Sequence, residues 1–191
     1  MTAHYKLALP AKTLENADPH AKAVLEKAKS RVGFLPNMYA AMVNSPGLLE
    51  IYLDGYDRFR KDSGFTPAEQ EVVFLTISRG NGCDYCMGAH SMIADKMSKV
   101  PLQVTDAIRE GRKIPDPKLA ALSAFTETMF RTRGLPSSAD VKAFLAAGYE
   151  ERHVLAIILA LGVKTLSNYS NHLFHTPLDE AFASRAWKKS A

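Results

Sequence analysis

Both cysteines of the chain, Cys83 and Cys86, lie in one short stretch. Two cysteines separated by two residues can close a disulfide, hold a metal ion or carry thiol redox chemistry. If the residues after Gly82 form a helix, Cys83 lies at its N-terminus, where unpaired amides and the helix dipole favour a thiolate. Cys86 then lies one turn further on, within reach of Cys83 for a disulfide. We therefore expect this stretch to be the chemical centre, with Cys83 the more exposed of the two thiols.

Two acid–base groups are spaced to act with the cysteines. His90 follows Cys86 by four residues, which puts both side chains on one helix face and allows proton exchange directly or through a water. Glu71 lies in the first half of the otherwise apolar segment 67–79. If that segment packs against the cysteine helix, Glu71 orients and charges His90, and a Glu–His–Cys relay results. The alternative is a surface carboxylate and a histidine on a helix face.

Two other chemistries compete for the same residues. A thioredoxin-like fold needs a strand before C-x-x-C, and residues 72–78 alone could pass for one, but a helix start precedes them and the chain lacks further strand patterns. A zinc site could use both cysteines and His90, with His172 or His175 as a further ligand. The zinc alternative stays open from the sequence alone.

Composition excludes several classes of protein. The chain has 191 residues, of which 47% are hydrophobic and 23% charged, so we expect one globular domain rather than a disordered chain. Its 24 Lys and Arg are interleaved with 20 Asp and Glu, and the short basic clusters 58–61 and 188–189 are interpreted as solvated surface, which argues against nucleic-acid binding. The longest apolar run, 154–163, is shorter than the ~20 residues of a membrane span, and the N-terminus lacks a signal-peptide pattern. We expect a cytoplasmic protein without a membrane partner.

The elements that must position these residues are predicted to be helices. A capping side chain followed by proline marks a helix start, and glycines after basic residues mark helix ends. Thr66 also has the capping-box spacing to Glu69. Five dipeptides carry the start signal: Asp18-Pro19, Ser45-Pro46, Thr66-Pro67, Asp116-Pro117 and Thr176-Pro177. The expected helices cover about 18–32, 46–62, 67–79, 83–98, 102–112, 117–133, 138–147, 151–170 and 177–186.

The fold class predicted by this pattern is all-α, because segments with period-two alternation are missing. We expect an N-terminal arm over residues 1–17 and a single helical domain over 18–191. The segment 151–170 is apolar over much of its circumference, which suits a core helix or a subunit interface.

The spacing of Glu71, Cys83, Cys86 and His90 resembles the active-site pattern E-x11-C-x2-C-x3-H of the AhpD-like alkyl hydroperoxidases within the carboxymuconolactone decarboxylase superfamily. The resemblance covers about residues 30–183. Two further stretches resemble signatures of the peroxidase-related branch of that superfamily: Val32-Gly-Phe-Leu-Pro-Asn37, and Asn168-Tyr-Ser-Asn-His172 through Thr176-Pro-Leu-Asp-Glu-Ala-Phe182.

The resemblance implies an AhpD-like all-helical homo-oligomer, a trimer or hexamer, with thiol peroxidase activity and no bound cofactor or metal. Cys86 would be the peroxidatic thiol that becomes a sulfenic acid, Cys83 the resolving thiol, and Glu71 with His90 the proton relay. The partners implied are a hydroperoxide substrate and a dithiol reductant, which can be a dihydrolipoyl group. The cysteine pair argues against the lactone decarboxylation of the other branch.

Tyr85 departs from the family pattern. The best-known hydroperoxidases have a second relay histidine at this position, and tyrosine with its high pKa cannot replace it near neutral pH, although its hydroxyl can hydrogen-bond. Asn171 and His172 are further candidates to line a pocket, with an interface or capping role as the alternative. The hypothesis from another class is a helical oligomeric binding protein whose C-x-x-C senses redox state or metal; a general disulfide oxidoreductase is the related enzymatic alternative.

Overall fold

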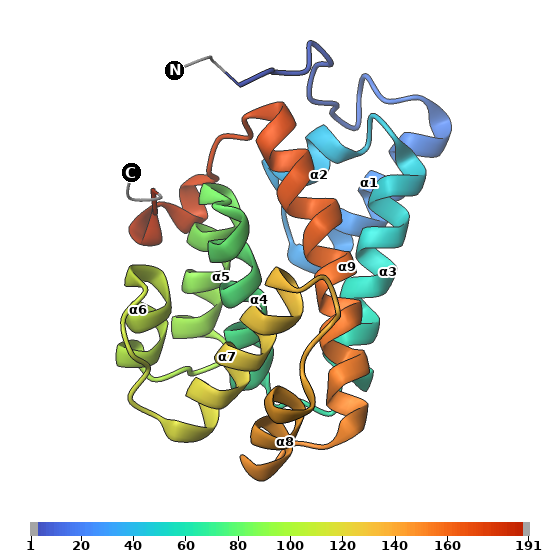
Figure 1. The fold of residues 1–191 in the computed structure, drawn as a ribbon. Coiled ribbons are helices and arrows are strands. Elements are labelled where there is room, and N and C mark those ends of the chain that lie inside the picture. Colours follow the sequence, from blue (N-terminus) through green and yellow to red (C-terminus); the bar gives the residue numbers. More distant parts are fainter. Residues whose placement is uncertain (1–3, 189–191) are drawn as a thin grey trace.

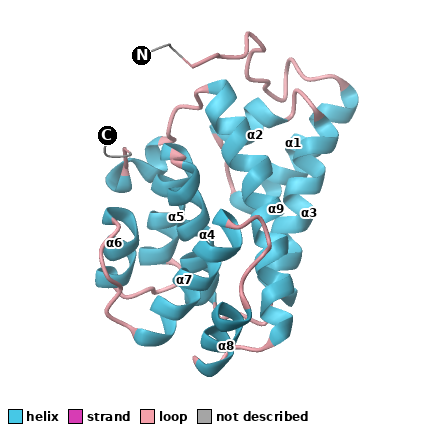
Figure 2. Cartoon of the chain, in the orientation of Figure 1, coloured by secondary structure: helices cyan, strands magenta, loops and turns pink. Residues whose placement is uncertain are grey.

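The computed structural model describes residues 4–188, and every regular element in that range is helical (Figure 2). The predicted all-α fold class is therefore confirmed. Residues 1–3 of the expected arm and residues 189–191 of the expected domain lie outside the described residues. The elements, labelled in Figure 1, are α1 Pro19–Val32, α2 Asn37–Met42, α3 Pro46–Asp62, α4 Pro67–Asn81, α5 Asp84–Lys96, α6 Leu102–Glu110, α7 Pro117–Arg131, α8 Ser138–Ala146, α9 Glu151–Phe174 and the 3₁₀-helix η1 Glu180–Arg185.

Capping side chains stabilise three of the helix starts that a proline marks. Asp18, Thr66 and Asp116 each accept a hydrogen bond from a backbone N–H in the first turn of their helix. At the start of α4, Thr66 and Glu69 form the expected reciprocal capping box. Such caps satisfy donors that have no partner inside the helix. The helix that carries Glu71 therefore begins where the sequence predicts.

Two of the five expected starts differ. Ser45 precedes α3, but its side chain makes no capping hydrogen bond. Thr176 and Pro177 start no helix, because the segment is tied to α2 instead. The Pro177 carbonyl accepts from Asn37 Nδ2 at 3.1 Å, and the Asp179 carboxylate accepts from the Asn37 N–H at 3.1 Å. Only the short 3₁₀-helix follows, beyond these contacts.

Two helices depart from the expected boundaries. Helix α2 lies where the sequence predicts no element, because six residues are too short to show a helical period. Its residues Met38–Met42 are all buried. Helix α9 continues to Phe174 instead of ending near 170, and His175 closes it in the left-handed conformation (φ 49°).

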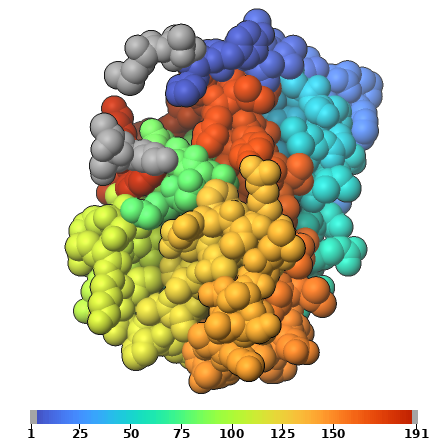
Figure 3. All heavy atoms as spheres, in the orientation of Figure 1, coloured from blue at the N-terminus to red at the C-terminus, as the bar shows by residue number. Residues whose placement is uncertain are grey.

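Helix α4 lies at the centre of the packing. It contacts α5, α6, α7 and α9, and ten consecutive residues, 69–78, are buried. Helices α3 and α9 run side by side along one edge of the molecule (Figure 1). The yellow and orange atoms of α7, α8 and the loop between them cover the lower part of the face seen in Figure 3. Side chains on α4 can therefore meet side chains from α5, α6, α7 and α9.

Helix α9 meets the length and composition criteria of a membrane-crossing helix, but half of its most apolar window is buried inside the protein. One face contributes core residues such as Ile157 and Ala160. The opposite face exposes large apolar side chains at helical spacing: Leu155, Ile158, Leu159, Tyr169 and Leu173. One face of α9 is therefore part of the core, and the opposite face forms an exposed apolar stripe made of these five residues.

Candidate active site

Both cysteines lie in the core because of the turn between α4 and α5. Gly82 adopts a left-handed conformation (φ 67°) that ends α4, and Cys83 caps the start of α5 with its N–H donated to the Ser78 carbonyl at 3.0 Å. Cys86 lies in the first turn of α5. Both thiols are free and buried, with exposed fractions of 0% for Cys83 and 2% for Cys86. The expectation that Cys83 is the more exposed thiol is wrong, because helix α9 packs over this turn.

The predicted packing of α4 against α5 brings Glu71 and His90 together. Glu71 Oε2 lies 2.8 Å from His90 Nδ1, and the carboxylate is completely buried. Its other oxygen accepts from Arg60 of α3, a member of the basic cluster that the sequence assigns to solvated surface. That assignment is wrong for Arg60, because the aromatic rings of Tyr56 and Phe74 guide its side chain inward. Burial alone would raise the pKa of Glu71, but His90 and Arg60 outweigh it and hold the carboxyl pKa below its usual range.

Lys164 is a functional candidate that the motif does not contain. It projects from the middle of α9, is completely buried, and its Nζ lies 3.0 Å from His90 Nε2. An ammonium group can only donate, so Nε2 accepts and the imidazole proton lies on Nδ1, facing Glu71. Burial and the Lys164 charge lower the pKa of His90 and keep the ring neutral. Glu71, His90 and Lys164 therefore form an ordered row, and Lys164 also hydrogen-bonds to the Cys86 thiol.

A signal for Lys164 was present in the sequence. It is the single Asp, Glu, Lys or Arg between Arg152 and Phe174, within an otherwise uncharged stretch. A lone charge inside an apolar helix is expensive to bury unless it is paired, so it marks a functional candidate. Arg60 carries no such signal, because it stands among other charged residues.

The two thiols are not equivalent. Burial alone would raise the pKa of Cys86, but a hydrogen bond from Cys83 and the Lys164 charge outweigh it, so the Cys86 pKa lies well below its ordinary value. The same bond, together with burial, raises the pKa of Cys83. Cys83 and Lys164 therefore favour the thiolate of Cys86, whereas the sequence places the favoured thiolate at Cys83.

The α9 residues after Lys164 complete the cysteine environment. Asn171 donates from Nδ2 toward Cys86 Sγ at 3.4 Å and Cys83 Sγ at 3.8 Å, so it contacts both thiols but does not line the cavity that Cys86 borders. Ser167 Oγ lies 4.0 Å from Cys86 Sγ. His172, in contrast, is exposed and stacks on Tyr169, so the expectation that it lines the pocket is wrong. Its neighbour Asn171 takes the inward face because the helix turns 100° per residue.

Tyr85 faces the C-terminal segment rather than the proton row. Its hydroxyl donates to Asp179 Oδ2 at 2.5 Å, and burial together with this carboxylate raises the Tyr85 pKa. Asp179 also accepts from the Asn37 N–H, so one carboxylate joins α5 to α2. Tyr85 therefore anchors the first turn of the cysteine helix and is not an acid–base group near neutral pH.

An apolar cavity of about 610 Å³ reaches this site. Cys86 and His90 line it, whereas Cys83 does not. Its lining includes a group of aromatic side chains, Phe34, Tyr39, Tyr52, Tyr56, Tyr85 and Phe182. Within residues 4–188, no group of three or more His, Cys, Asp or Glu side chains is arranged to hold a metal ion. The arrangement can hold a thiolate against an apolar ligand and exchange protons behind it.

The comparisons with known proteins concern the family region and the fold. A model of the carboxymuconolactone decarboxylase family matches residues 46–128, which contain Glu71, both cysteines and His90. A search of curated proteins found no match. The whole chain superposes on several solved structures, each less than 25% identical to it, so these likenesses establish the fold alone.

Three solved structures illustrate the likeness. An alkylhydroperoxidase AhpD core, an uncharacterized peroxidase-related protein from Ralstonia eutropha JMP134, has a TM-score of 0.80 at 22% identity, covering 97% of this chain and 100% of that chain. An uncharacterized peroxidase-related protein from Silicibacter sp. TM1040 gives 0.76 at 19% identity, covering 96% and 99%. The debrominase Bmp8, in complex with 2,3,4-tribromopyrrole, gives 0.74 at 15% identity, covering 94% and 96%. Residues 46–128 thus match the carboxymuconolactone decarboxylase family, and the fold of the chain is similar to that of the two peroxidase-related proteins and of the debrominase.

Proposed function

We propose that the protein is a thiol-dependent hydroperoxidase in which Cys86 attacks the peroxide and Cys83 resolves the product. One observation carries the assignment. The cysteine with the lowered pKa is the one that lines the apolar cavity, and its partner thiol lies behind it and donates a hydrogen bond. A peroxidatic thiol must be both ionised and accessible to the peroxide.

The reaction proceeds in three balanced steps. The Cys86 thiolate attacks the outer peroxide oxygen, the O–O bond breaks, and Cys86 sulfenic acid and an alkoxide form; one proton converts the alkoxide to the alcohol. Cys83 sulfur then attacks the sulfenic sulfur, and the disulfide forms with release of water. A dithiol reductant, such as a dihydrolipoyl group, exchanges with the disulfide and leaves oxidised itself, which restores both thiols.

The proton for the alkoxide comes from the row behind the thiolate. Lys164 donates to His90 Nε2 at 3.0 Å, and His90 lines the cavity, so this pair can supply a proton beside the Cys86 sulfur. Glu71 holds the His90 proton on Nδ1, which keeps Nε2 free to exchange with Lys164. Lys164 thus has two tasks: it stabilises the thiolate before attack and supplies the proton after it. Arg60 keeps Glu71 ionised throughout.

A thiol titration tests the proposal. Free thiols are counted in the reduced protein before and after one equivalent of an organic hydroperoxide, with metal analysis of the same sample. We expect rapid loss of two thiols, recovery with a dithiol, and repeated turnover when both reagents are in excess. Thiol loss that is not catalytic in excess dithiol would favour a redox sensor, and bound metal with protected thiols would favour a metal-sensing protein; either result contradicts the proposal.

Reductive debromination is a second candidate, favoured by one observation. The aromatic walls of the cavity suit a flat apolar ring beside a thiolate, and the debrominase Bmp8 shares the fold. The discriminating measurement is bromide release from 2,3,4-tribromopyrrole in the presence of dithiol. Bromide release without hydroperoxide turnover would replace the first candidate with this one.

The exposed stripe on α9 supports assembly into a homo-oligomer, a trimer or a multiple of it. Exposed apolar side chains at helical spacing are typical of an interface. Sedimentation should give a mass above the 21.0 kDa of one chain. Ile158→Asp, in the middle of the stripe, should release monomers with unchanged circular dichroism. A monomeric unsubstituted protein at micromolar concentration would contradict the assembly while leaving the chemistry untouched.

A further inference from the structure

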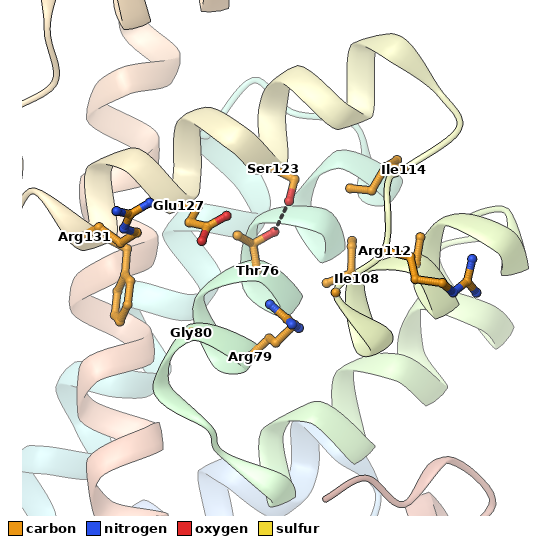
Figure 4. Close-up of a pocket in the computed structure, with 12 residues that line it drawn as sticks. Thr76, Arg79, Gly80, Ile108, Arg112, Ile114, Ser123, Glu127 and Arg131 are labelled. Carbon is orange, nitrogen blue, oxygen red and sulfur yellow. Dashed lines mark hydrogen bonds between the residues drawn. The ribbon is translucent and has the colours of Figure 1, made fainter. Parts of the chain in front are cut away.

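A second cavity, of about 310 Å³, lies between α4, α6 and α7 (Figure 4). It shares no lining residue with the cysteine cavity. Arg79 of α4 extends toward the space bordered by Thr76, Ser123 and Glu127, whereas Arg112 turns outward (Figure 4). Nothing in the proposed peroxide chemistry uses this cavity.

Arg79 is the unusual group in it. Its Nε is buried and has no hydrogen-bond partner within the described part of the chain, and its guanidinium takes part in none of the ion pairs found there. The other partly buried arginines have partners: Arg60 pairs with Glu71, and Arg109 donates to Ser91. The Nε of Arg185 also lacks a hydrogen bond, but its guanidinium forms ion pairs with Asp95 and Asp106, whereas Arg79 forms none within residues 4–188. A buried donor without a partner is costly, and a bound ion or ligand is a common reason for one.

The backbone makes room for this guanidinium. A Cβ on Gly111, at the C-terminus of α6, would lie 2.0 Å from Arg79 Nη2. Gly111 also has a left-handed conformation (φ 70°), in which other residues are strained. On the α4 side, a Cβ on Gly80 would lie 3.0 Å from the Phe130 ring. Gly111 thus leaves the space that Arg79 fills, and Gly80 leaves space for the Phe130 ring at the cavity wall.

The chemistry of the lining selects an anion. The lining residues include three arginines, Arg79, Arg112 and Arg131, but a single carboxylate, Glu127. Arg112 is already paired with Glu110, so Arg79 and Arg131 are the cations left for a ligand. The Thr76 hydroxyl donates to the Val72 carbonyl, so Ser123 donates its proton to Thr76 Oγ1 at 2.8 Å and leaves the ligand contacts to the arginines. A planar guanidinium fork matches the two oxygens of a phosphate or carboxylate group.

The geometry points to a second ligand site here, for a small molecule that carries an oxyanion, a phosphate or a carboxylate, with Arg79 as its main anchor. The cavity holds more than the oxyanion alone, so the ligand carries an organic portion against Ile108 and Ile114. The assignment is independent of the cysteine chemistry.

The test is titration of the reduced protein with inorganic phosphate and, separately, with acetate at constant ionic strength, read by amide chemical shifts and by Tm. We expect saturable shifts at α4, α6 and α7 and a rise in Tm with concentration. The stronger of the two anions identifies the oxyanion class. Arg79→Met should weaken binding at least about tenfold, as the loss of a charge-assisted contact does.

Two variants make the result decisive. Arg58→Met removes an exposed arginine of α3 that pairs with Asp54, and it should leave binding unchanged. Glu127→Gln removes the opposing carboxylate and should strengthen binding several-fold, an effect that misfolding cannot imitate. Absence of saturable binding by either anion, equal losses in Arg58→Met and Arg79→Met, or an experimental structure with Arg79 bound to Glu127 would each overturn the proposal.

Discussion

The two cavities that border α4 differ in whether the buried charged groups beside them have partners within the chain. Beside the cysteine cavity, Arg60 pairs with Glu71, Glu71 bonds to His90, and Lys164 bonds to His90 and stabilises the Cys86 thiolate, so each charged group has a partner. In the second cavity, the Arg79 Nε has no partner among the described residues. Burying a charge is tolerable only when a partner compensates for lost hydration. The first site is therefore complete within this chain, and the second needs a component from outside it.

The largest expected effect follows from the asymmetry of the two thiols in the first cavity. Cys86→Ser should abolish peroxide consumption, because it removes the ionised thiol at the cavity wall. Cys83→Ser should leave a single turnover that ends in Cys86 sulfenic acid, since the resolving thiol is gone. Labelling with a dimedone-type reagent, read by mass spectrometry, detects that acid. If the loss of the first turnover follows Cys83→Ser instead, the two roles are reversed.

The next effect concerns the proton row. His90→Ala or Glu71→Gln should slow peroxide reduction ~10²–10⁴-fold, the usual contribution of acid–base groups. Lys164→Met should also raise the Cys86 pKa, because the cation that stabilises the thiolate is lost. Alkylation of Cys86 by iodoacetamide should then be slow at neutral pH and recover as the pH rises. An unchanged pH profile of alkylation in Lys164→Met would remove Lys164 from the mechanism.

A matched pair of arginine variants compares the cavities directly. Arg60→Met takes one of two partners from the fully buried Glu71 and should lower the free energy of unfolding by about 3 kcal/mol. Arg79→Met breaks no ion pair, so the free energy of unfolding should change by less than about 0.5 kcal/mol. Urea unfolding without added phosphate measures both. Equal losses would mean that Arg79 has a partner within the protein after all.

The smallest expected effect is on the pH dependence of stability. The folded protein holds the His90 pKa below its usual 6.5. Above about pH 6.5 the ring is neutral in the folded and in the unfolded protein. Below that pH the unfolded chain binds a proton at His90 that the folded protein does not bind, so the free energy of unfolding decreases as the pH falls. His90→Asn should flatten the decline in unfolding free energy between about pH 7.5 and about pH 5.5. An identical slope in the variant would contradict the neutral, lysine-bound imidazole.

The sequence predicts the parts of the molecule that depend on nearby residues. The capping side chains before α4 and the spacing from Cys83 to His90 are local, so they locate the site helices and the Glu71–His90 contact. Arg60 and Lys164 reach the site through tertiary packing, and α2 is too short to show a period. The C-terminal prolines fail as a helix start because Asn37, far away in the sequence, binds that segment.

The second cavity could not be predicted from the spacing of residues in the sequence. Its lining comes from α4, α6 and α7, and its arginines look like ordinary surface charges in the sequence. Only the three-dimensional arrangement shows that Arg79 Nε is enclosed.

The buried lysine of α9 has a consequence for the redox cycle. With Cys86 as a thiolate, the charges of Arg60, Lys164, Glu71 and Cys86 cancel in the dry interior. Formation of the disulfide removes the negative charge on sulfur, and Lys164, which has given its proton to the alkoxide, becomes neutral at the same time. The attraction between the Cys86 thiolate and Lys164 therefore exists only in the reduced form, which it stabilises, so the reduction potential of the disulfide is raised. The oxidised form should melt below the reduced form, the reverse of the usual stabilisation by a disulfide.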